Sequence, residues 1–237
     1  MPSSSSTLPT VAVVGAGPGL GRAIARRFGA AGHPIVLVSR NAAKLQGLAA
    51  ELTAEGITAR AYPADVTDAK ALTGALEAAA AELGRISVLS YSPAPTFPNT
   101  AGQIPDLKAL GFTPAAETTA ESVRPMFDMF VGGALTAAAA VLPAMREAGD
   151  GALLFTTGMT AVAPIPGMAN SGLVLPGLRS WARSLHDDLA SEGIWTGHLS
   201  IGLQVGPGLG DGDPDALAER WYQLAQARDT FETTVGF

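Results

Sequence analysis

Glycines near the start of the chain have the spacing needed to hold a phosphate group. Gly15, Gly19 and Gly21 form a G-x-x-x-G-x-G pattern directly after the apolar residues Val11–Val14. Glycine allows a tight turn and lets a pyrophosphate approach without a Cβ in the way, while the N–H groups of a following helix bind its charge. Such a turn can serve only helix–strand packing, but its place between an apolar run and a helix favours nucleotide binding. The predicted contacts are Gly15, Gly17, Pro18, Gly19, Leu20 and Gly21.

Polar residues at the end of the next apolar run indicate which nucleotide would bind. Ser39, Arg40 and Asn41 occupy the place where an acidic residue would hydrogen-bond a ribose 2′-hydroxyl. A carboxylate would repel a 2′-phosphate, whereas the Arg40 guanidinium would pair with it. A solvated arginine at the start of a helix is the alternative interpretation. We favour the first, which predicts NADP(H) as the cofactor with all three residues in its site.

Both groups need strands and helices that alternate along the chain. Apolar runs predict strands at residues 11–14, 35–38, 58–62, 88–91, 152–156 and 195–201. Helical patterns lie at residues 19–31, 42–55, 68–83, 119–146, 176–191 and about 213–227. Near-continuous apolar strands joined by helices predict an α/β fold with a doubly wound parallel sheet in three αβα layers, the Rossmann fold, as one domain over residues 11–237. Ligands would bind at the carboxyl ends of the strands.

Two segments fall outside this alternation. Residues 1–10 are rich in Ser and Pro and are expected to form a flexible tail. Residues 93–117 form a long Pro-rich segment that contains Phe97, Leu107, Leu110 and Phe112. Loops of this length are commonly lids, so the segment is either a partial cover over the mouth of the site or an insertion packed on its rim.

Composition excludes several classes of function. The chain has 237 residues, no Cys and three scattered His, so neither disulfides nor a metal site are expected. With 21 acidic against 15 basic residues and no basic tract, nucleic-acid binding has no electrostatic basis. The longest apolar stretch, residues 131–145, is too short to span a bilayer and contains Pro143. We therefore expect a cytoplasmic protein without a membrane or nucleic-acid partner.

Four further stretches carry motifs in a defined order. They are Ala64-Asp65-Val66 after the third apolar run, residues 133–145 with their Leu-Pro-Ala-Met end, residues 151–158, and residues 184–189. Together with the glycine turn, they make the chain resemble the short-chain dehydrogenase/reductase family over nearly its whole length. The resemblance implies a cofactor site that also includes Asp65, Val66, Ser92 and Pro93. It also implies a homodimer or homotetramer paired through the helices at 119–146 and 176–191.

The residues that carry out catalysis in this family are replaced here. The family uses a Ser to hold a carbonyl, a Tyr as acid/base, a Lys to lower the pKa of that Tyr, and an Asn to hold a relay water. The corresponding positions fall, in the same order, on Gly158, Ser171, Leu175 and Phe130. Positioned proton transfer is thereby weakened, and the pocket is largely apolar, which suits a hydrophobic substrate.

Three residues are candidates to replace the missing groups: Tyr91, Thr157 and Ser171. Tyr91 either donates a proton or is a packing aromatic, while Thr157 and Ser171 either orient a carbonyl or cap turns. His186 and His198 are expected to lie away from the site. The leading hypothesis is an NADP(H)-dependent oxidoreductase that acts on an activated C=O, C=N or C=C bond. A non-redox enzyme (cyclase, dehydratase or isomerase) and a catalytically silent NADP(H)-binding sensor are the alternatives.

Overall fold

The computed structural model describes residues 8–95 and 106–237 and contains a sheet whose strands are all parallel. Among these residues the sheet has seven strands in the order β3-β2-β1-β4-β5-β6-β7. They are β1 (Thr10–Val14), β2 (Ile35–Val38), β3 (Ala59–Ala61), β4 (Ile86–Tyr91), β5 (Gly151–Gly158), β6 (Ile194–Ile201) and β7 (Glu232–Val235). The strand order reverses between β1 and β4, so their carboxyl ends form the switch point where such sheets bind ligands.

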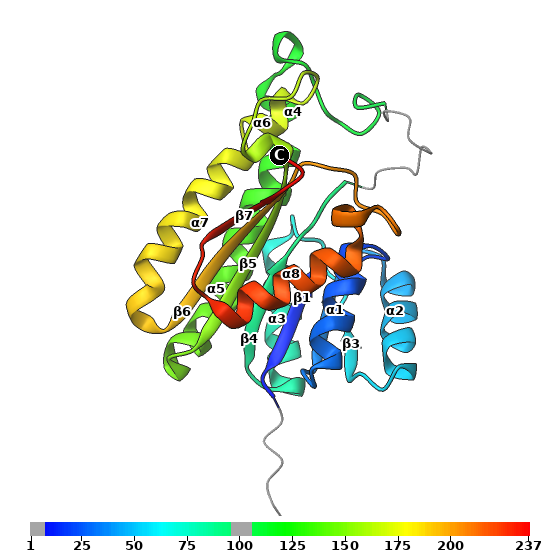
Figure 1. The fold of residues 1–237 in the computed structure, drawn as a ribbon, viewed down its shortest axis with the longest axis vertical. Helices are drawn as coiled ribbons and strands as arrows, with labels where there is room; N and C mark the ends of the chain where they lie inside the picture. Colours follow the sequence, from blue (N-terminus) through cyan, green and yellow to red (C-terminus); the bar gives the residue numbers. More distant parts are fainter. Residues whose placement is uncertain (1–7, 96–105) are drawn as a thin grey trace, which may run out of the picture.

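Helices cover both faces of the sheet (Figure 1). One layer contains α1 (Leu20–Ala30), α2 (Ala42–Ala54) and α8 (Pro214–Ala227). The other contains α3 (Ala69–Leu83), α4 (Ala120–Phe127), α5 (Gly133–Ala148) and α7 (Leu175–Leu189), with the short α6 (Ala169–Gly172) before α7. Each layer buries an apolar stripe against the strands, such as Phe28 of α1 and Leu72 of α3. The predicted doubly wound α/β fold in three layers is confirmed.

The strands are apolar along their whole length because both faces are covered. Residues 11–14 and 35–38 are fully shielded from solvent. β1 begins at Thr10, inside the expected tail, of which residues 1–7 lie outside the described residues. The sequence pattern does not predict β7, since Glu-Thr-Thr-Val contains no apolar run. It nevertheless pairs with β6 at the edge of the sheet, with Glu232 beside His198.

The helix predicted at residues 119–146 is present as one long helical run. α4 continues through a π-helical turn, η2 (Asp128–Gly132), into α5, so the run extends from Ala120 to Ala148. By length and composition alone it is long and apolar enough to cross a bilayer, unlike the shorter stretch of residues 131–145. Its inner face, including Ala134, Ala138 and Val141, packs in the core beside the sheet. This packing is that of a helix layer in an α/β domain.

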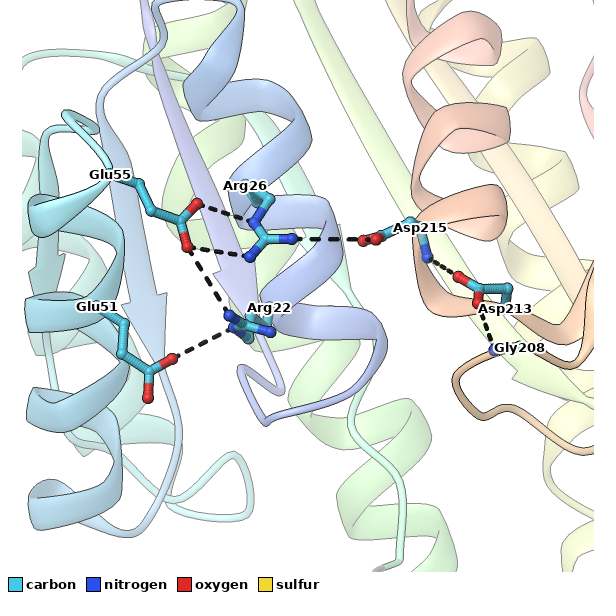
Figure 2. A network of polar contacts seen from close by, with 7 residues as sticks. All are labelled: Arg22, Arg26, Glu51, Glu55, Gly208, Asp213 and Asp215. Atoms are coloured by element: carbon cyan, nitrogen blue, oxygen red, sulfur yellow. Dashed lines mark hydrogen bonds and ion pairs between the residues drawn. The ribbon is translucent and has the colours of Figure 1, made fainter.

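Ion pairs on the surface link α1 to α2 and α8 (Figure 2). Arg26 of α1 pairs with Glu55 through Nε–Oε2 at 2.9 Å and Nη2–Oε1 at 3.0 Å, and lies 4.0 Å from Asp215 of α8. Arg22 lies 3.3 Å from Glu51 and 3.8 Å from Glu55. All these groups are partly exposed, so solvent screens them. We therefore attribute the placement of α1 mainly to its buried apolar face.

Candidate active site

The turn after β1 needs glycine at both of its ends. Gly15 has φ +92°, and a Cβ built on it would lie 2.7 Å from the backbone of Ser92 and Pro93. A Cβ on Gly21 would lie 2.9 Å from Ala16 Cα, where α1 packs on the turn. These two glycines therefore allow the close approach of the end of β1 to the end of β4 and of α1 to the turn.

The middle of the turn is open. A Cβ on Gly19 would have no heavy atom within 4 Å, and one on Gly17 would reach only Gly15 O at 4.0 Å. Pro18 is exposed, Leu20 is the first residue of α1, and no side chain caps this helix at Gly19. Arg22 N donates a hydrogen bond to Gly17 O at 2.9 Å, whereas the N–H groups of Leu20 and Gly21 have no partner among the described residues and are left for a ligand such as a phosphate group. The contacts predicted for these residues remain predictions that this geometry supports.

The end of β2 presents one cation and one helix cap. Arg40 is exposed and forms no hydrogen bond or ion pair with any residue in the described ranges. Asn41 Oδ1 accepts a hydrogen bond from Lys44 N at 2.9 Å and so caps α2. Ser39 O accepts one from Ala64 N at 3.1 Å, which ties the ends of β2 and β3 together. The guanidinium of Arg40 is the group at this edge that is available to an anion.

Asp65 follows β3 and is oriented by its own turn. Its Oδ1 accepts hydrogen bonds from Thr67 N at 2.9 Å and Thr67 Oγ1 at 2.8 Å. These bonds, with a smaller contribution from the charge of Arg40, lower the pKa of Asp65 below its usual value. The carboxylate is therefore ionised and held near the end of β2. The side chain of Val66 is instead buried in the core beneath it.

Ser92 and Pro93 follow β4 and lie beside the glycine turn. Ser92 N donates a hydrogen bond to Val14 O at 2.9 Å. Ser92 Oγ donates one to Thr156 Oγ1 at 2.9 Å, and Trp221 Nε1 donates another to the same oxygen at 2.9 Å. The structure thus brings together the ends of β1, β4 and β5, as a site at the switch point requires.

The structure places Tyr91 as a packing aromatic, which does not support the proton-donor role considered from the sequence. Its side chain is fully buried, and its hydroxyl donates a hydrogen bond to Met129 O at 2.5 Å. Burial raises the pKa of Tyr91 far above its ordinary value, so the hydroxyl is a poor acid at neutral pH. A Cβ on Gly133 would lie 2.1 Å from this hydroxyl. The hydroxyl ties β4 to the π-helical turn between α4 and α5.

Of the positions that carry Ser, Tyr and Lys in the family, the first is open and the other two are closed. A Cβ on Gly158 would meet no heavy atom within 4 Å, so space lies at the end of β5. Ser171 is buried, and its hydroxyl lies 3.0 Å from Thr160 Oγ1 and 3.1 Å from Met168 O. Leu175 is buried at the start of α7. The hydroxyl of Ser171 is therefore occupied by protein partners, which does not support its candidate role.

The insertion after β4 is fastened to α6. Asn170 is fully buried and donates hydrogen bonds to Gly111 O at 2.8 Å and Ser122 O at 3.1 Å. Its Oδ1 accepts one from Thr113 N at 3.1 Å. Phe112 is also buried in the core. Residues 106–117 thus pack against α6, while residues 96–105 lie outside the described residues, and both the lid and the rim insertion stay predictions.

A buried polar chain, not predicted from the sequence, leads away from Thr157. Thr157 Oγ1 lies 3.0 Å from His198 Nε2 and 3.1 Å from Ser200 Oγ. His198 Nδ1 lies 3.3 Å from Glu232 Oε1, and this carboxylate is paired with Arg179. His198 is fully buried, and the pairing of β6 with β5 brings it beside Thr157, a contact that the sequence does not predict.

The sequence does contain a signal for this chain. Thr196, His198 and Ser200 alternate along β6 and so share one face of the strand. All three are fully buried, and among the described residues His198 and Ser200 have side-chain partners whereas the hydroxyl of Thr196 has none. His186 has a different partner, since its Nδ1 lies 2.8 Å from Thr196 O.

Comparison with known proteins identifies the family. The sequence profile described as short chain dehydrogenase matches residues 9–203. The chain belongs to this family. Sulfoacetaldehyde reductase 2 of Chromohalobacter salexigens is 29% identical over 194 residues, which cover 81% of this chain and 71% of that protein. The short-chain reductase protein NovJ of Streptomyces niveus is 28% identical over 208 residues, or 88% of this chain and 72% of NovJ.

Solved structures of the family share the fold. A short-chain dehydrogenase from Rhodopseudomonas palustris matches with a TM-score of 0.80 and 27% identity, over 96% of this chain and 97% of that one. An NADPH-bound short chain oxidoreductase from Pseudomonas aeruginosa PAO1, described as containing an atypical catalytic center, matches with a TM-score of 0.82 over 97% of this chain and 96% of that one. Its identity is 20%, so this likeness concerns the fold alone. With relatives named reductases and dehydrogenases, the family of this chain is one of oxidoreductases.

Proposed function

We propose that this short-chain dehydrogenase is an NADP(H)-dependent oxidoreductase that acts on a hydrophobic small molecule. The observation that carries the proposal is the open glycine turn, with the exposed Arg40 at the end of the neighbouring strand. The first feature suits a pyrophosphate and the second a 2′-phosphate. The NADPH of the Pseudomonas aeruginosa structure is in line with this cofactor.

Each part of the cofactor would have a place on this chain. Residues 15–21 would hold the pyrophosphate, Ser39 and Arg40 the 2′-phosphate, and Asp65 the adenine, while Asn41 would act through the start of α2. Ser92 and Pro93 would border the cofactor at the switch point. The nicotinamide, when bound, supplies or accepts a hydride. The open space at Gly158 would receive the reacting part of the substrate, whereas the hydroxyl of Thr157 is buried and bonded to His198 and Ser200, which does not support its candidate role.

The substrate class follows from the rim of the site. Large apolar side chains are exposed in the segments that follow β5, β6 and β7, and the carboxyl ends of these parallel strands share one edge of the sheet. The residues are Met159, Val162, Val205, Leu209 and Phe237. Exposed apolar groups beside a candidate site favour an apolar ligand. Without the Tyr and Lys of the family, an activated C=O, C=N or conjugated C=C bond is the substrate bond that needs least acid assistance.

NADPH absorbance and NADPH binding together test the proposal. The wild type is mixed with cyclohexanone, 2-cyclohexenone and a cyclic imine, and we expect NADPH consumption with at least one of them. Arg40→Ala is expected to weaken NADPH binding ~10-fold or more, about 1.4 kcal/mol, and to leave NADH binding unchanged. Arg60→Ala is the matched control, because Arg60 pairs with Glu82 at 3.2 Å on the surface.

The outcomes of this test separate the alternatives. NADPH binding without consumption of any acceptor would point to a silent binding protein or a sensor. Product formation without NADPH would point to a non-redox enzyme. Absence of NADPH binding would overturn the proposal in all its parts.

We further propose a homodimer or homotetramer. Phe127 of α4, Leu135 of α5 and Leu173 before α7 are 47%, 41% and 67% exposed, on or beside the helices expected to pair. A surface hollow of about 390 Å³ lies among Val123, Arg124, Phe127 and Leu173, away from the glycine turn. Light scattering measures the mass directly, and Leu135→Lys is expected to shift it toward the monomer. A monomeric wild type at micromolar concentration would overturn the proposal.

A further inference from the structure

Three hydrogen-bonding side chains meet where β4 and β5 end, on the side of the sheet that carries the glycine turn. Trp221 Nε1 of α8 donates a hydrogen bond to Thr156 Oγ1 at 2.9 Å, and Ser92 Oγ donates another to the same oxygen at 2.9 Å. Trp221 packs in the helix layer that contains α1, together with Ala16 of the glycine turn. Trp221 and Thr156 are buried, whereas Ser92 is half-buried. Ser92 is therefore the member of this group that is most accessible to a ligand.

Ser92 adjoins the turn that would hold the pyrophosphate. A Cβ on Gly15 would lie 2.7 Å from Ser92 C and 2.7 Å from Ser92 O, and Ser92 N donates a hydrogen bond to Val14 O at 2.9 Å. The preceding Tyr91 faces the layer of α5, where its hydroxyl reaches Met129 O. Because successive side chains of a strand point to opposite faces, that of Ser92 faces the layer of α1. Its hydroxyl thus lies on the same side of the sheet as the start of α1.

The hydrogen bonds of this group determine what Ser92 can bind. Trp221 Nε1 can only donate, so Thr156 Oγ1 accepts from both of its neighbours. The proton of Ser92 is then committed to Thr156, and Ser92 Oγ offers only lone pairs to a ligand. The oxygens of a pyrophosphate are acceptors too, so they are not suitable partners. A suitable partner carries a proton to donate, as a hydroxyl does.

We propose that Ser92 Oγ accepts a hydrogen bond from a hydroxyl of the nicotinamide-side ribose of NADP(H), with Thr156 and Trp221 as positioning residues. This proposal rests on the proposed function. A dinucleotide crosses the switch point with one mononucleotide on each half of the sheet. Arg40, at the end of β2, belongs to the adenosine half, so the nicotinamide half falls on the β4–β5 side. The ribose of that half follows the pyrophosphate directly, as Ser92 follows the glycine turn in space.

Three ligands that share the adenosine half locate the contact. They are NADPH, 2′-phospho-ADP-ribose, which lacks the nicotinamide, and 2′,5′-ADP, which lacks the second ribose as well. Calorimetry measures their affinities. We expect Ser92→Ala to weaken the first two by roughly fivefold to tenfold and to leave 2′,5′-ADP unchanged, because one hydrogen bond to the ribose is lost. Ser90→Ala is the matched control, because this buried hydroxyl two residues earlier on β4 has no partner among the described residues.

A pair of substitutions at Thr156 tests its positioning role. Thr156→Val keeps the shape and removes the acceptor, so the hydroxyl of Ser92 is no longer held in one orientation. We expect about threefold weaker binding of NADPH and of 2′-phospho-ADP-ribose, unchanged binding of 2′,5′-ADP, and recovery in Thr156→Ser. A purely structural role of Thr156 would weaken all three ligands and would overturn its part in the proposal.

A second readout needs no substitution. The indole N–H signal of Trp221 in nitrogen-15 NMR is expected to shift when NADPH or 2′-phospho-ADP-ribose binds, and much less with 2′,5′-ADP. The reason is that a ribose hydroxyl bonded to Ser92 changes the hydrogen bonds that Thr156 accepts. The signal of Trp195 is the control, since its Nε1 has no partner in the described part of the chain. If Thr156→Val does not fold, this signal and Ser92→Ala decide the matter.

The ligand series separates the outcomes. Unchanged NADPH affinity in Ser92→Ala would overturn the proposal, and so would equal losses for all three ligands, which would mean that the hydroxyl supports the glycine turn. A loss for NADPH that 2′-phospho-ADP-ribose does not share would place the contact on the nicotinamide and overturn the ribose assignment. In each of these cases, NADPH binding by the wild type leaves the proposed oxidoreductase function standing. A wild type that binds none of the three ligands would overturn both proposals.

Discussion

The two halves of the sheet differ in the groups that they contribute to the site: mainly backbone groups on one side and side chains on the other. On the β1–β2 side, the features that fit a ligand are backbone conformation, an uncapped helix start and the exposed Arg40. On the β5–β7 side, the polar groups are side chains, and most are bonded to one another in the core. Thr156 is hydrogen-bonded to Ser92 and Trp221, and Thr157 is hydrogen-bonded to His198. The first half is open to a ligand, and the second is largely closed.

This difference would account for the expectation from the sequence that the chain keeps the phosphate-binding half of the family's site and replaces the catalytic half. A phosphate cradle made of backbone depends on a few glycines, and each replacement brings a Cβ into the turn or into the phosphate space. A catalytic set made of side chains can change one residue at a time while the strands keep their packing. Ser171 lies in α6 and Leu175 begins α7, so the two positions expected to correspond to the Tyr and Lys of the family still belong to helices beside the sheet.

The largest expected effect comes from substitutions in the glycine turn on the β1–β2 side, where Gly15 and Gly19 should respond differently. Gly15→Ala forces a Cβ onto the backbone of Ser92 and Pro93 at positive φ, and we expect a loss of about 3 kcal/mol in unfolding free energy together with loss of NADPH binding. Gly19→Ala meets open space, so we expect unchanged stability but NADPH binding weaker by ~10-fold or more, because the Cβ fills the cradle. Urea unfolding and calorimetry measure both, with Gly74→Ala on α3 as the control. Equal NADPH affinity in Gly19→Ala and the wild type would contradict the cradle.

The next effect concerns the closed half and its response to acid. The pKa of His198 falls to about 4 in the folded chain from an ordinary value of 6.5, so the unfolded chain binds a proton first as the pH drops. Stability is therefore complete above pH 6.5 and is lost as the pH falls toward 4. From pH 7 to pH 5 we expect the unfolding free energy to fall by about 2 kcal/mol.

Urea unfolding at pH 7, 6 and 5 measures this loss. His198→Gln removes the titrating group, so its unfolding free energy should change much less over the same range. A wild type with constant stability from pH 7 to pH 5 would mean that His198 is not buried as a neutral ring. The polar groups on the β5–β7 side would then be more accessible to water than the structure indicates.

The sequence predicts the open half better than the closed one, for a physical reason. The glycine turn, Arg40 and Asp65 are local patterns, each contained in a few consecutive residues. The partners of Thr157 are 41 and 43 residues away, and only strand pairing brings them together. β7 is short and polar, so neither the strand nor the place of Glu232 beside His198 follows from an apolar pattern. Tyr91 illustrates the same limit, since the partner of its hydroxyl is Met129 O in the π-helical turn, 38 residues away along the chain.

The smallest expected effect tests whether Asn41 belongs to the cofactor site directly or through its helix. Asn41→Ala removes the cap of α2, and Asp68→Ala removes the equivalent cap of α3, where Oδ1 accepts from Ala71 N at 3.0 Å. We expect each change to lower the unfolding free energy by about 1 kcal/mol and to leave the ratio of NADPH to NADH affinity unchanged. A loss of NADPH affinity in Asn41→Ala that Asp68→Ala does not share would show that the amide itself contacts the cofactor. The β1–β2 side would then bind the cofactor through a further side chain as well as through backbone groups. Only the glycine turn would then distinguish it from the β5–β7 side.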